Sequence, residues 1–225
     1  MSKFDKQNIR SLKHFDSINF SELPSRFKAN LINSCTGYKS SNLLATANDK
    51  GVSNLAIFNS VVHIGSNPPM LGFILRPLTV RRDTYNNFKS TGYFTVNQVA
   101  KDIFPKAHQT AAKYDEDTSE FAQTGLTEQY LDDFKAPYVK ESRIKLGCSY
   151  ENEYEIKENG CLLIIGKIQH LYLPEELIHK DGWVQLDKAD TVTSIGLDGY
   201  ALPTVLDRLS YAQPNQEANS LLDGA

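Results

Sequence analysis

A β-hairpin over residues 144–173 is the feature that most restricts the fold of this chain. Apolar and polar residues alternate from Ile144 to Glu151, which is typical of a strand with one buried face. The pair Asn159-Gly160 favours a tight turn, and a second strand is predicted over Cys161–Leu173. The pattern therefore indicates an antiparallel sheet.

Shorter strands are predicted on either side of this hairpin. They cover Asn42–Ala47, Val52–Val62, Met70–Leu75 and Tyr93–Val99, with a last strand around Val192, Ile195 and Leu197. The turn Asn48-Asp49-Lys50-Gly51 and the break Asn67-Pro68-Pro69 separate the first three of them.

Helices are predicted between strands rather than after every strand. One runs from about Thr79 to Gly92, and residues 102–131 are helical or irregular. The sequence thus contains about seven strands and about three helices. This order favours a mainly β fold, a β-barrel with inserted helices, over a doubly wound parallel sheet.

The domain organisation is predicted to be simple, because the sequence has no internal repeat and no low-complexity segment. Residues 1–32 form an N-terminal lead-in segment, residues 33–214 one domain, and residues 215–225 a C-terminal tail. In the lead-in segment, Ser21 is expected to cap a short helical turn. Phe27, Leu31 and Ile32 fall roughly on one face, which predicts a packing role.

Composition excludes several classes of protein. The 225 residues carry 24 Lys+Arg and 27 Asp+Glu, and a net charge of −3 argues against binding to nucleic acid or to an anionic membrane surface. Apolar runs are far shorter than the roughly 20 residues of a membrane-spanning helix. The N-terminal residues lack an apolar signal-peptide core, and the three cysteines form no C-x-x-C pair, so a cytoplasmic location is expected.

Familiar catalytic and nucleotide-binding motifs are missing. No G-x-G-x-x-G follows a predicted strand, and Gly37-Tyr38-Lys39-Ser40 lacks the glycine spacing of a P-loop. There is no H-E-x-x-H, no G-x-S-x-G and no cysteine-histidine cluster, so no metal site is predicted. The five histidines are scattered, and each is expected to be structural.

Amide and hydroxyl side chains inside predicted strands are the first sign of a ligand. Asn54, Asn59 and Ser60 are poor strand formers, and burying them is unfavourable unless their polar groups find partners. A ligand with many hydrogen-bonding edges would supply such partners. The alternative is that they lie on the solvent face of an amphipathic strand.

Three arginines follow the same region. Arg76, Arg81 and Arg82 flank a strand end, a proline and the start of a helix, whose first N–H groups are free. Arginine suits a phosphate monoester because its planar fork matches the phosphate oxygens. Asp83 could cap the helix, and Thr84 could bond to the backbone or to phosphate. A solvated charged turn is the alternative.

An ordered series of short motifs over residues 30–214 resembles a known family. The series runs Ala45-Thr46-Ala47, Asn54-Leu55-Ala56, Pro68-Pro69, Arg76, Thr84, Asn87, Gly92-Tyr93-Phe94-Thr95-Val96-Asn97, Ala107-His108-Gln109-Thr110, Ser119-Glu120-Phe121, Gly125-Leu126-Thr127, Ala136-Pro137 and Leu209-Ser210-Tyr211-Ala212-Gln213-Pro214. It resembles the flavin reductase-like proteins, the FMN-binding split-barrel group that includes flavoredoxin-type proteins. The family usually ends in Y-A-R-P, and here Gln213 replaces the arginine.

The resemblance implies a Greek-key split barrel that forms a homodimer and holds FMN near the subunit interface. It implies electron transfer from NAD(P)H through FMN to free flavin or to a partner protein. By position, the isoalloxazine and ribityl chain would contact Thr46, Asn54, Ala56, Phe58, Asn59 and Ser60. The phosphate end would be held by Arg76, Arg81, Arg82, Asp83 and Thr84.

Further candidates for the site lie in the loop before residue 41 and at His108, and each has an alternative structural interpretation. The loop from Asn33 to Ser40 departs from the proline-rich strand of many members, so Lys39 or Tyr38 could reach the flavin edge, or the loop could be only a connection. His108 is the candidate for a polar group at the open flavin face that positions substrate or delivers a proton; a structural histidine is the alternative.

Three functions remain consistent with these patterns. The first is an FMN-dependent NAD(P)H oxidoreductase, in which the protein orients the flavin and tunes its electronics. The second is a non-enzymatic flavin-binding electron carrier or storage protein. The third is a barrel that binds another phosphorylated ligand and performs no reaction.

Overall fold

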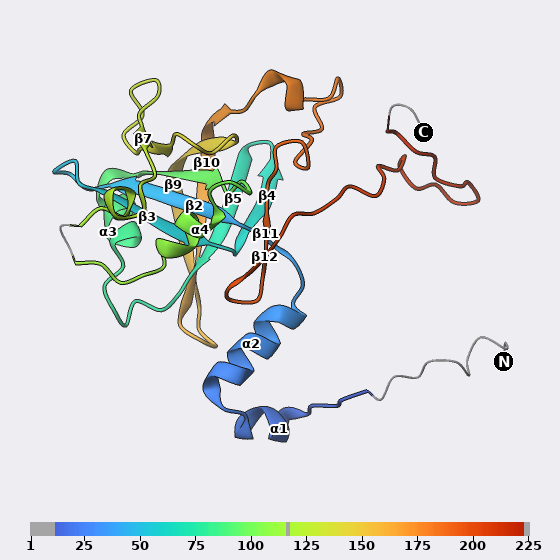
Figure 1. Cartoon of the computed structure of the whole chain (residues 1–225), viewed down its shortest axis with the longest axis horizontal. Helices are drawn as coiled ribbons and strands as arrows, with labels where there is room; N and C mark the ends of the chain where they lie inside the picture. Colours follow the sequence, from blue (N-terminus) through green and yellow to red (C-terminus); the bar gives the residue numbers. More distant parts are fainter. Residues whose placement is uncertain (1–11, 116–117, 223–225) are drawn as a thin grey trace.

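An antiparallel sheet of seven strands forms the body of the protein. The computed structural model describes residues 12–115 and 118–222, and the strand order is β3-β2-β6-β9-β10-β5-β4 (Figure 1). The strands are β2 (Asn42–Ala47), β3 (Ser53–Phe58), β4 (Val61–Ser66), β5 (Pro69–Leu75), β6 (Tyr93–Gln98), β9 (Lys145–Ile156) and β10 (Cys161–Tyr172). The predicted mainly β fold with inserted helices is confirmed.

Short elements complete the architecture. The helices after the lead-in are α3 (Asp83–Thr91), α4 (Phe104–Gln109) and α5 (Glu120–Thr124), with a 3-10 turn at Glu175–Leu177. β1 (Lys39–Ser40), β11 (Thr193–Ile195) and β12 (Gly199–Ala201) form a three-stranded sheet. β7 (Glu128–Gln129) pairs with β8 (Tyr138–Val139).

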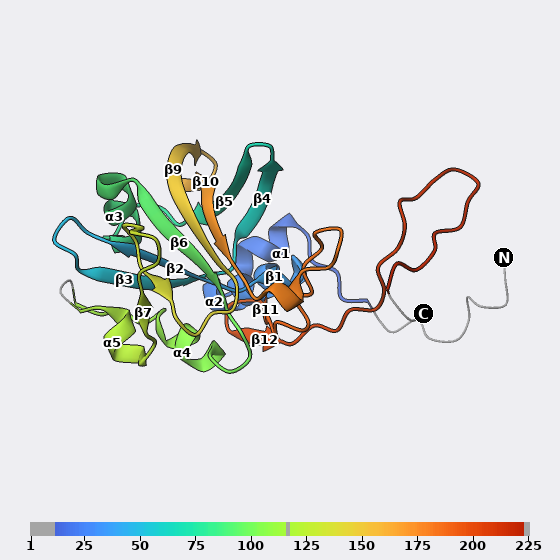
Figure 2. The ribbon, with the colours of Figure 1, turned by 90° about the horizontal axis from the view of Figure 1, so that it is seen from above.

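The sheet separates two apolar clusters, because side chains alternate between its faces. Leu44 belongs to the inner cluster around Phe73. The Phe73 ring packs edge-on against the rings of Phe58 and Phe94, and the distance between ring centroids is 5.4 Å in each pair. Leu43 belongs to the outer cluster, which the α4 and α5 region covers. Figure 2 shows these two helices below β2 and β3, opposite the strands β5, β9 and β10. Since both faces are covered, all six residues of β2 are buried.

The long hairpin passes close to the inner cluster at a glycine. A Cβ atom on Gly166 would lie 2.4 Å from Cζ of Phe94, so no side chain fits there. The pairing of β10 with β9 also shifts register between Ile165 and Gly166. The predicted turn at Asn159-Gly160 is present, and Gly160 has a φ of 70°.

The structure differs from the sequence prediction at the boundaries of two elements. The single strand expected over Val52–Val62 is two strands, β3 and β4, which the chain separates at Asn59 and Ser60. They lie at opposite ends of the sheet order, because β3 pairs with β2 and β4 pairs with β5. The helix expected from Thr79 begins instead at Asp83, and it ends at Gly92 as predicted, with a φ of 81°.

The lead-in segment contains two helices, α1 (Ser17–Glu22) and α2 (Ser25–Cys35). Asp16 caps α1, while Ser21 lies inside that helix and bonds back to a carbonyl, so the predicted cap is wrong. Within the described chain neither helix has a buried residue, and Phe27 is 50% exposed. The face that was expected to pack is therefore not buried among the described residues. Residues 1–11 and 223–225 of the predicted end segments lie outside the described residues.

No helix in the described part of the chain is long and apolar enough to cross a membrane.

Candidate functional site

Four buried polar side chains meet where β2, β3 and α3 join. Thr46 and Asn54 are directly opposite each other in the β2–β3 ladder. The amide of Asn54 donates to Oγ1 of Thr84 at 3.0 Å, and the amide of Asn87 donates to Oγ1 of Thr46 at 3.1 Å. Thr84 and Asn87 share a face of α3 because they are three residues apart. We call Thr46, Asn54, Thr84 and Asn87 the buried quartet.

These contacts change the interpretation of the strand amides. The Nδ2 group of Asn54 has a partner within the chain, and that of Asn59 donates to the carbonyl of Gly196 at 3.3 Å. The hydroxyl of Ser60 donates to Oδ1 of Asn59, also at 3.3 Å. A ligand is thus not needed to supply their first hydrogen bonds. The alternative of a fully solvated face is also wrong for Asn54, which is buried.

The N-terminus of α3 lies next to the quartet and carries the predicted phosphate-binding residues. Arg81 is paired with Asp83 in the first turn, with both Nε and Nη2 2.5 Å from Oδ1. Arg82 occupies the cap position, and its Nε atom is buried without a hydrogen-bond partner among the described residues. A buried unpaired cationic donor beside free helix N–H groups suits an anion. Arg76, just after β5, is exposed.

A small polar cavity of about 30 Å³ adjoins this helix end. Asn54 and Asn87 of the quartet line it, together with Arg81 and Asp83. Its volume suits a few water molecules or a small polar group. The body of a larger ligand would have to lie outside this cavity.

A carboxylate covers the free edge of β3 near the same point. Oε2 of Glu120, in α5, accepts a hydrogen bond from the backbone N–H of Leu55 at 2.8 Å. The hydroxyl of Ser53 donates to Oε1 of Glu128 at 2.6 Å and lies 2.7 Å from that of Ser119. Burial raises the pKa of the Glu120 carboxyl. One backbone donor at the edge of β3 is therefore satisfied by a side chain in place of a neighbouring strand.

A second group of predicted residues surrounds the β11–β12 hairpin. Lys39 is opposite Ser194 in the β1–β11 ladder, and Asn59 bonds to Gly196 in the turn of the hairpin. Nδ1 of His108 lies 3.0 Å from the hydroxyl of Tyr200 in β12. Ser60 follows Asn59 at the same end of β3. This group and the quartet occupy opposite ends of the strand (Figure 2).

The side chains of this second group differ in how accessible they are to a ligand. The Lys39 ammonium donates to the carbonyls of Asn33 at 2.6 Å and Gly37 at 3.2 Å, so it holds the preceding loop together. His108 is exposed on α4. Between the two ends, Ala56 and Phe58 extend from β3 on the same face as Asn54, and Phe58 packs on Phe73.

Residues 36–186 match the family model described as "Flavin reductase like domain". The chain belongs to this family. Its membership places it among flavin-related oxidoreductases, and the resemblance inferred from the motif series is confirmed.

Solved structures agree with the family and define its fold. A proposed flavin reductase with a split barrel domain from Shewanella frigidimarina is 43% identical, with a TM-score of 0.86 over 89% of this chain and 100% of that one. Component B of nitrilotriacetate monooxygenase from Bacillus cereus is 22% identical, with a TM-score of 0.77 over 88% and 100%. Flavoredoxin of Desulfovibrio vulgaris is 20% identical, with a TM-score of 0.64 over 79% and 91%. The flavin reductase-like domain of this chain is thus a split barrel, as predicted.

Sequence reasoning did not select three residues that the structure brings into this region. Asn87 had a local signal, since it follows Thr84 by one helical turn. Glu120 belongs to the motif series of the family resemblance, but its contact with Leu55 had no sequence signal, because the two residues are far apart in the sequence. The contact of Tyr200 with His108 had none for the same reason. The described residues contain no group of three or more His, Cys, Asp and Glu side chains that could hold a metal ion.

Proposed function

We propose that this protein binds FMN and passes electrons from NAD(P)H to a flavin or protein acceptor. The observation that carries the proposal is the unpaired, buried Nε of Arg82 at the start of α3, in a chain of the flavin reductase-like family. A phosphate group there would pair this donor and the free helix N–H groups. The residues present therefore fit the phosphate end of FMN.

The roles of the residues at this end follow from their contacts. Arg82 and the first N–H groups of α3 would hold phosphate, and the Thr84 hydroxyl is held in place by Asn54. Arg81 neutralises Asp83, which would otherwise repel an anion at the same helix end. Arg76 is exposed and could approach the phosphate from the β5 side.

The rest of the site would extend along β3 toward His108. Bound FMN would supply the redox chemistry, by accepting hydride from the nicotinamide and passing the electrons on. Ala56 and Phe58 offer an apolar surface, and Asn59 and Ser60 offer polar groups at the far end of β3. If the Tyr200 hydroxyl donates to Nδ1, neutral His108 carries its proton on Nε2, on an exposed side chain. His108 could then donate that proton to a substrate.

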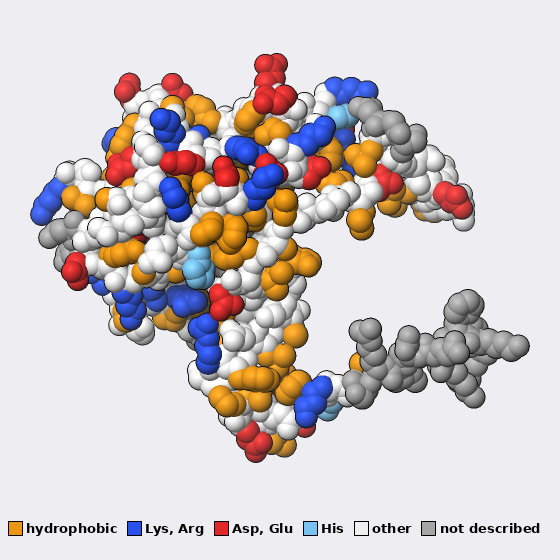
Figure 3. Space-filling model, viewed as in Figure 1, with side chains coloured by type: hydrophobic (Ala, Val, Ile, Leu, Met, Phe, Trp, Pro, Cys, Tyr) orange, Lys and Arg blue, Asp and Glu red, His pale blue; other side chains and the backbone are white. Residues whose placement is uncertain are grey.

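We further propose that a second copy of the chain completes the site as a homodimer. The cavity at the quartet is too small for a flavin within one protomer. Helices α1 and α2 expose apolar side chains, including Phe27 and Ile32, and Figure 3 shows apolar side chains on the surface of the projecting helical region. Short helices that bury nothing are marginal in water, so a protein partner would stabilise them.

An absorption spectrum of the purified protein, taken before and after anaerobic addition of NADH or NADPH, tests the electron-transfer proposal. The proposal expects a bound-flavin spectrum that bleaches at catalytic rates with one of the two nicotinamides. Bleaching by dithionite alone would favour an electron carrier instead. A colourless protein that takes up no added FMN would rule out both functions and leave another phosphorylated ligand as the alternative.

A further inference from the structure

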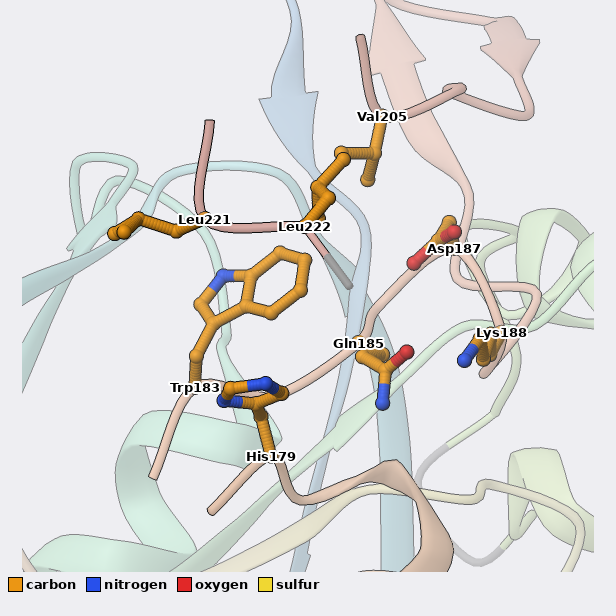
Figure 4. A pocket seen from close by; sticks show the side chains of 8 residues that line it. All are labelled: His179, Trp183, Gln185, Asp187, Lys188, Val205, Leu221 and Leu222. Atoms are coloured by element: carbon orange, nitrogen blue, oxygen red, sulfur yellow. The ribbon is translucent and has the colours of Figure 1, made fainter. Parts of the chain in front are cut away.

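A cavity of about 340 Å³ lies outside the region discussed above. It is enclosed by the loop from His179 to Lys188, which follows the long hairpin, and by the C-terminal segment through Val205 and Leu222 (Figure 4). None of the residues assigned above to flavin binding lines it. Its volume is in the range of small-molecule sites, about 300–1,000 Å³.

The walls of the cavity differ in chemistry. Figure 4 shows the Trp183 indole on one side and the Asp187 carboxylate on the opposite side. Val205 and Leu222 form an apolar wall, and Gln185 adds an amide to the lining. An aromatic face, a carboxylate and an amide around one space are the elements that bind a flat, hydrogen-bonding ring.

The aromatic wall is held in place by a network of charges. The Arg208 guanidinium lies 5.0 Å from the centre of the Trp183 ring. Nη2 of Arg208 donates to Oδ2 of Asp181 at 2.5 Å, and Nδ1 of His179 lies 2.8 Å from Oδ1 of the same carboxylate. The loop and the C-terminal segment are thereby tied together, so the indole is positioned before any ligand enters.

The carboxylate opposite the indole is only partly satisfied. Oδ1 of Asp187 is buried and has no hydrogen-bond partner in the part of the chain that the structure describes. A buried acceptor without a donor is unfavourable, and a ligand N–H group that donates to this carboxylate would offset part of the penalty. Lys188 also lines the cavity, and its positive charge disfavours a ligand that is itself a permanent cation.

We propose that this cavity binds an aminopurine such as adenosine. The ring would stack on Trp183, and its exocyclic amine would donate to the Asp187 carboxylate. Gln185 and Lys188 supply donors for the ring nitrogens, and Val205 and Leu222 exclude water from the far side. This site does not depend on the proposed flavin-binding function.

Trp183 is the only tryptophan in the chain, so intrinsic tryptophan fluorescence reports on this cavity directly. The experiment titrates the full-length protein with adenosine and with inosine, which carries a carbonyl where adenosine carries the amine. Saturable quenching is expected with adenosine, and at least about tenfold weaker binding with inosine, because inosine cannot donate to Asp187 at that position.

The variant Asp187→Asn tests the assignment of the carboxylate. Its amide can donate to the carbonyl of inosine, so the preference for adenosine should be lost or reversed. Asp198→Asn is the matched control: this exposed residue pairs with Arg26, away from the cavity, and should leave both affinities unchanged. Should Asp187→Asn fail to fold, Leu222→Arg provides a second test, since it fills the apolar wall and should weaken adenosine binding by about tenfold or more.

The proposal is overturned if adenosine gives no saturable change, if the wild type binds both nucleosides equally, if a folded Asp187→Asn variant keeps the wild-type preference for adenosine over inosine, or if a folded Leu222→Arg variant binds adenosine like the wild type. FMN uptake by the same preparations is measured in parallel. Loss of nucleoside binding with normal FMN uptake, or the reverse, then separates this site from the proposed flavin site.

Discussion

The carboxylate of Glu120 and the backbone N–H of Leu55 form a 2.8 Å hydrogen bond between positions 65 residues apart in the sequence. This bond joins α5 to the exposed edge of β3, the strand that carries the quartet residue Asn54. The helix therefore does more than cover the outer apolar cluster, because it also satisfies the edge of the strand along which the proposed site extends.

Removing the acceptor at Glu120 should destabilise the fold. Glu120→Ala leaves the Leu55 N–H without its partner, which is expected to lower the free energy of unfolding by about 1–3 kcal/mol. Glu120→Gln keeps an acceptor oxygen and should cost much less. Urea denaturation of the two variants beside the wild type measures the difference, and equal losses would contradict the assigned bond.

The contribution of Glu120 to stability should fall as pH rises. Burial raises the pKa of this carboxyl in the folded protein, so the folded state keeps the proton after the unfolded chain has lost it. The folded state then binds more protons than the unfolded state from about pH 4.3, the ordinary glutamate pKa, up to the raised value. Relative to Glu120→Gln, the wild type should lose unfolding free energy across this window and stay constant above it. Urea titrations at a series of pH values test this, and a pH-independent difference would refute it.

The quartet should contribute to stability without any ligand. Asn87→Ala removes the donor to the buried Thr46 hydroxyl and is expected to cost about 1–3 kcal/mol. Asn86→Ala, at the exposed neighbouring position of α3, is the matched control and should change stability by less than about 0.5 kcal/mol. Thermal unfolding of the FMN-free proteins makes the comparison, and similar midpoints for both variants would argue against the quartet.

The two adjacent arginines should differ in their effect on FMN binding. Arg82→Ala removes an unpaired buried donor and should weaken FMN binding by about 1.5–3 kcal/mol, which is roughly ten- to a hundredfold. Arg81→Ala removes a group already paired with Asp83, so a smaller loss is expected. Quenching of FMN fluorescence gives both affinities. Unchanged binding in a folded Arg82→Ala variant would mean that the phosphate lies elsewhere.

A methyl group at Gly166 should disturb the inner cluster. Gly166→Ala places a Cβ atom 2.4 Å from the Phe94 ring, and overpacking of this kind costs about 1–3 kcal/mol. At Gly65 in β4 the nearest atom to an added Cβ would be 3.7 Å away, so Gly65→Ala is the control and should fold with near-wild-type stability. Chemical denaturation tests the pair, and a tolerated Gly166→Ala would show that Phe94 can move aside.

Several elements could be predicted from local patterns. The strand Asn42–Ala47 has the bounds expected from its apolar run and the turn that follows, and α3 ends at the predicted Gly92. The hairpin around Asn159-Gly160 was recognised from period-2 alternation and its turn. These signals act over a few residues, so the sequence displays them directly.

The break at Asn59 and Ser60 was missed because the surrounding residues look like one continuous strand. The start of α3 was placed too early because Thr is a favoured cap residue, whereas the cap position is occupied by Arg82, which makes no side-chain cap hydrogen bond. For β3 and β4, pairing with different strands decides where each element ends.

By itself the sequence determined that this chain folds as a β-barrel with inserted helices, and its motif series identified the flavin reductase-like family. Only the tertiary structure decided which polar groups meet: Asn54 with Thr84, Glu120 with Leu55, and Arg81 with Asp83, while Nε of Arg82 stays buried without a partner among the described residues. It also formed the Trp183 cavity from two separate segments. The physical reason is that alternation and turn residues act locally, whereas contacts between distant side chains depend on how the sheet curves and on what packs against its edges.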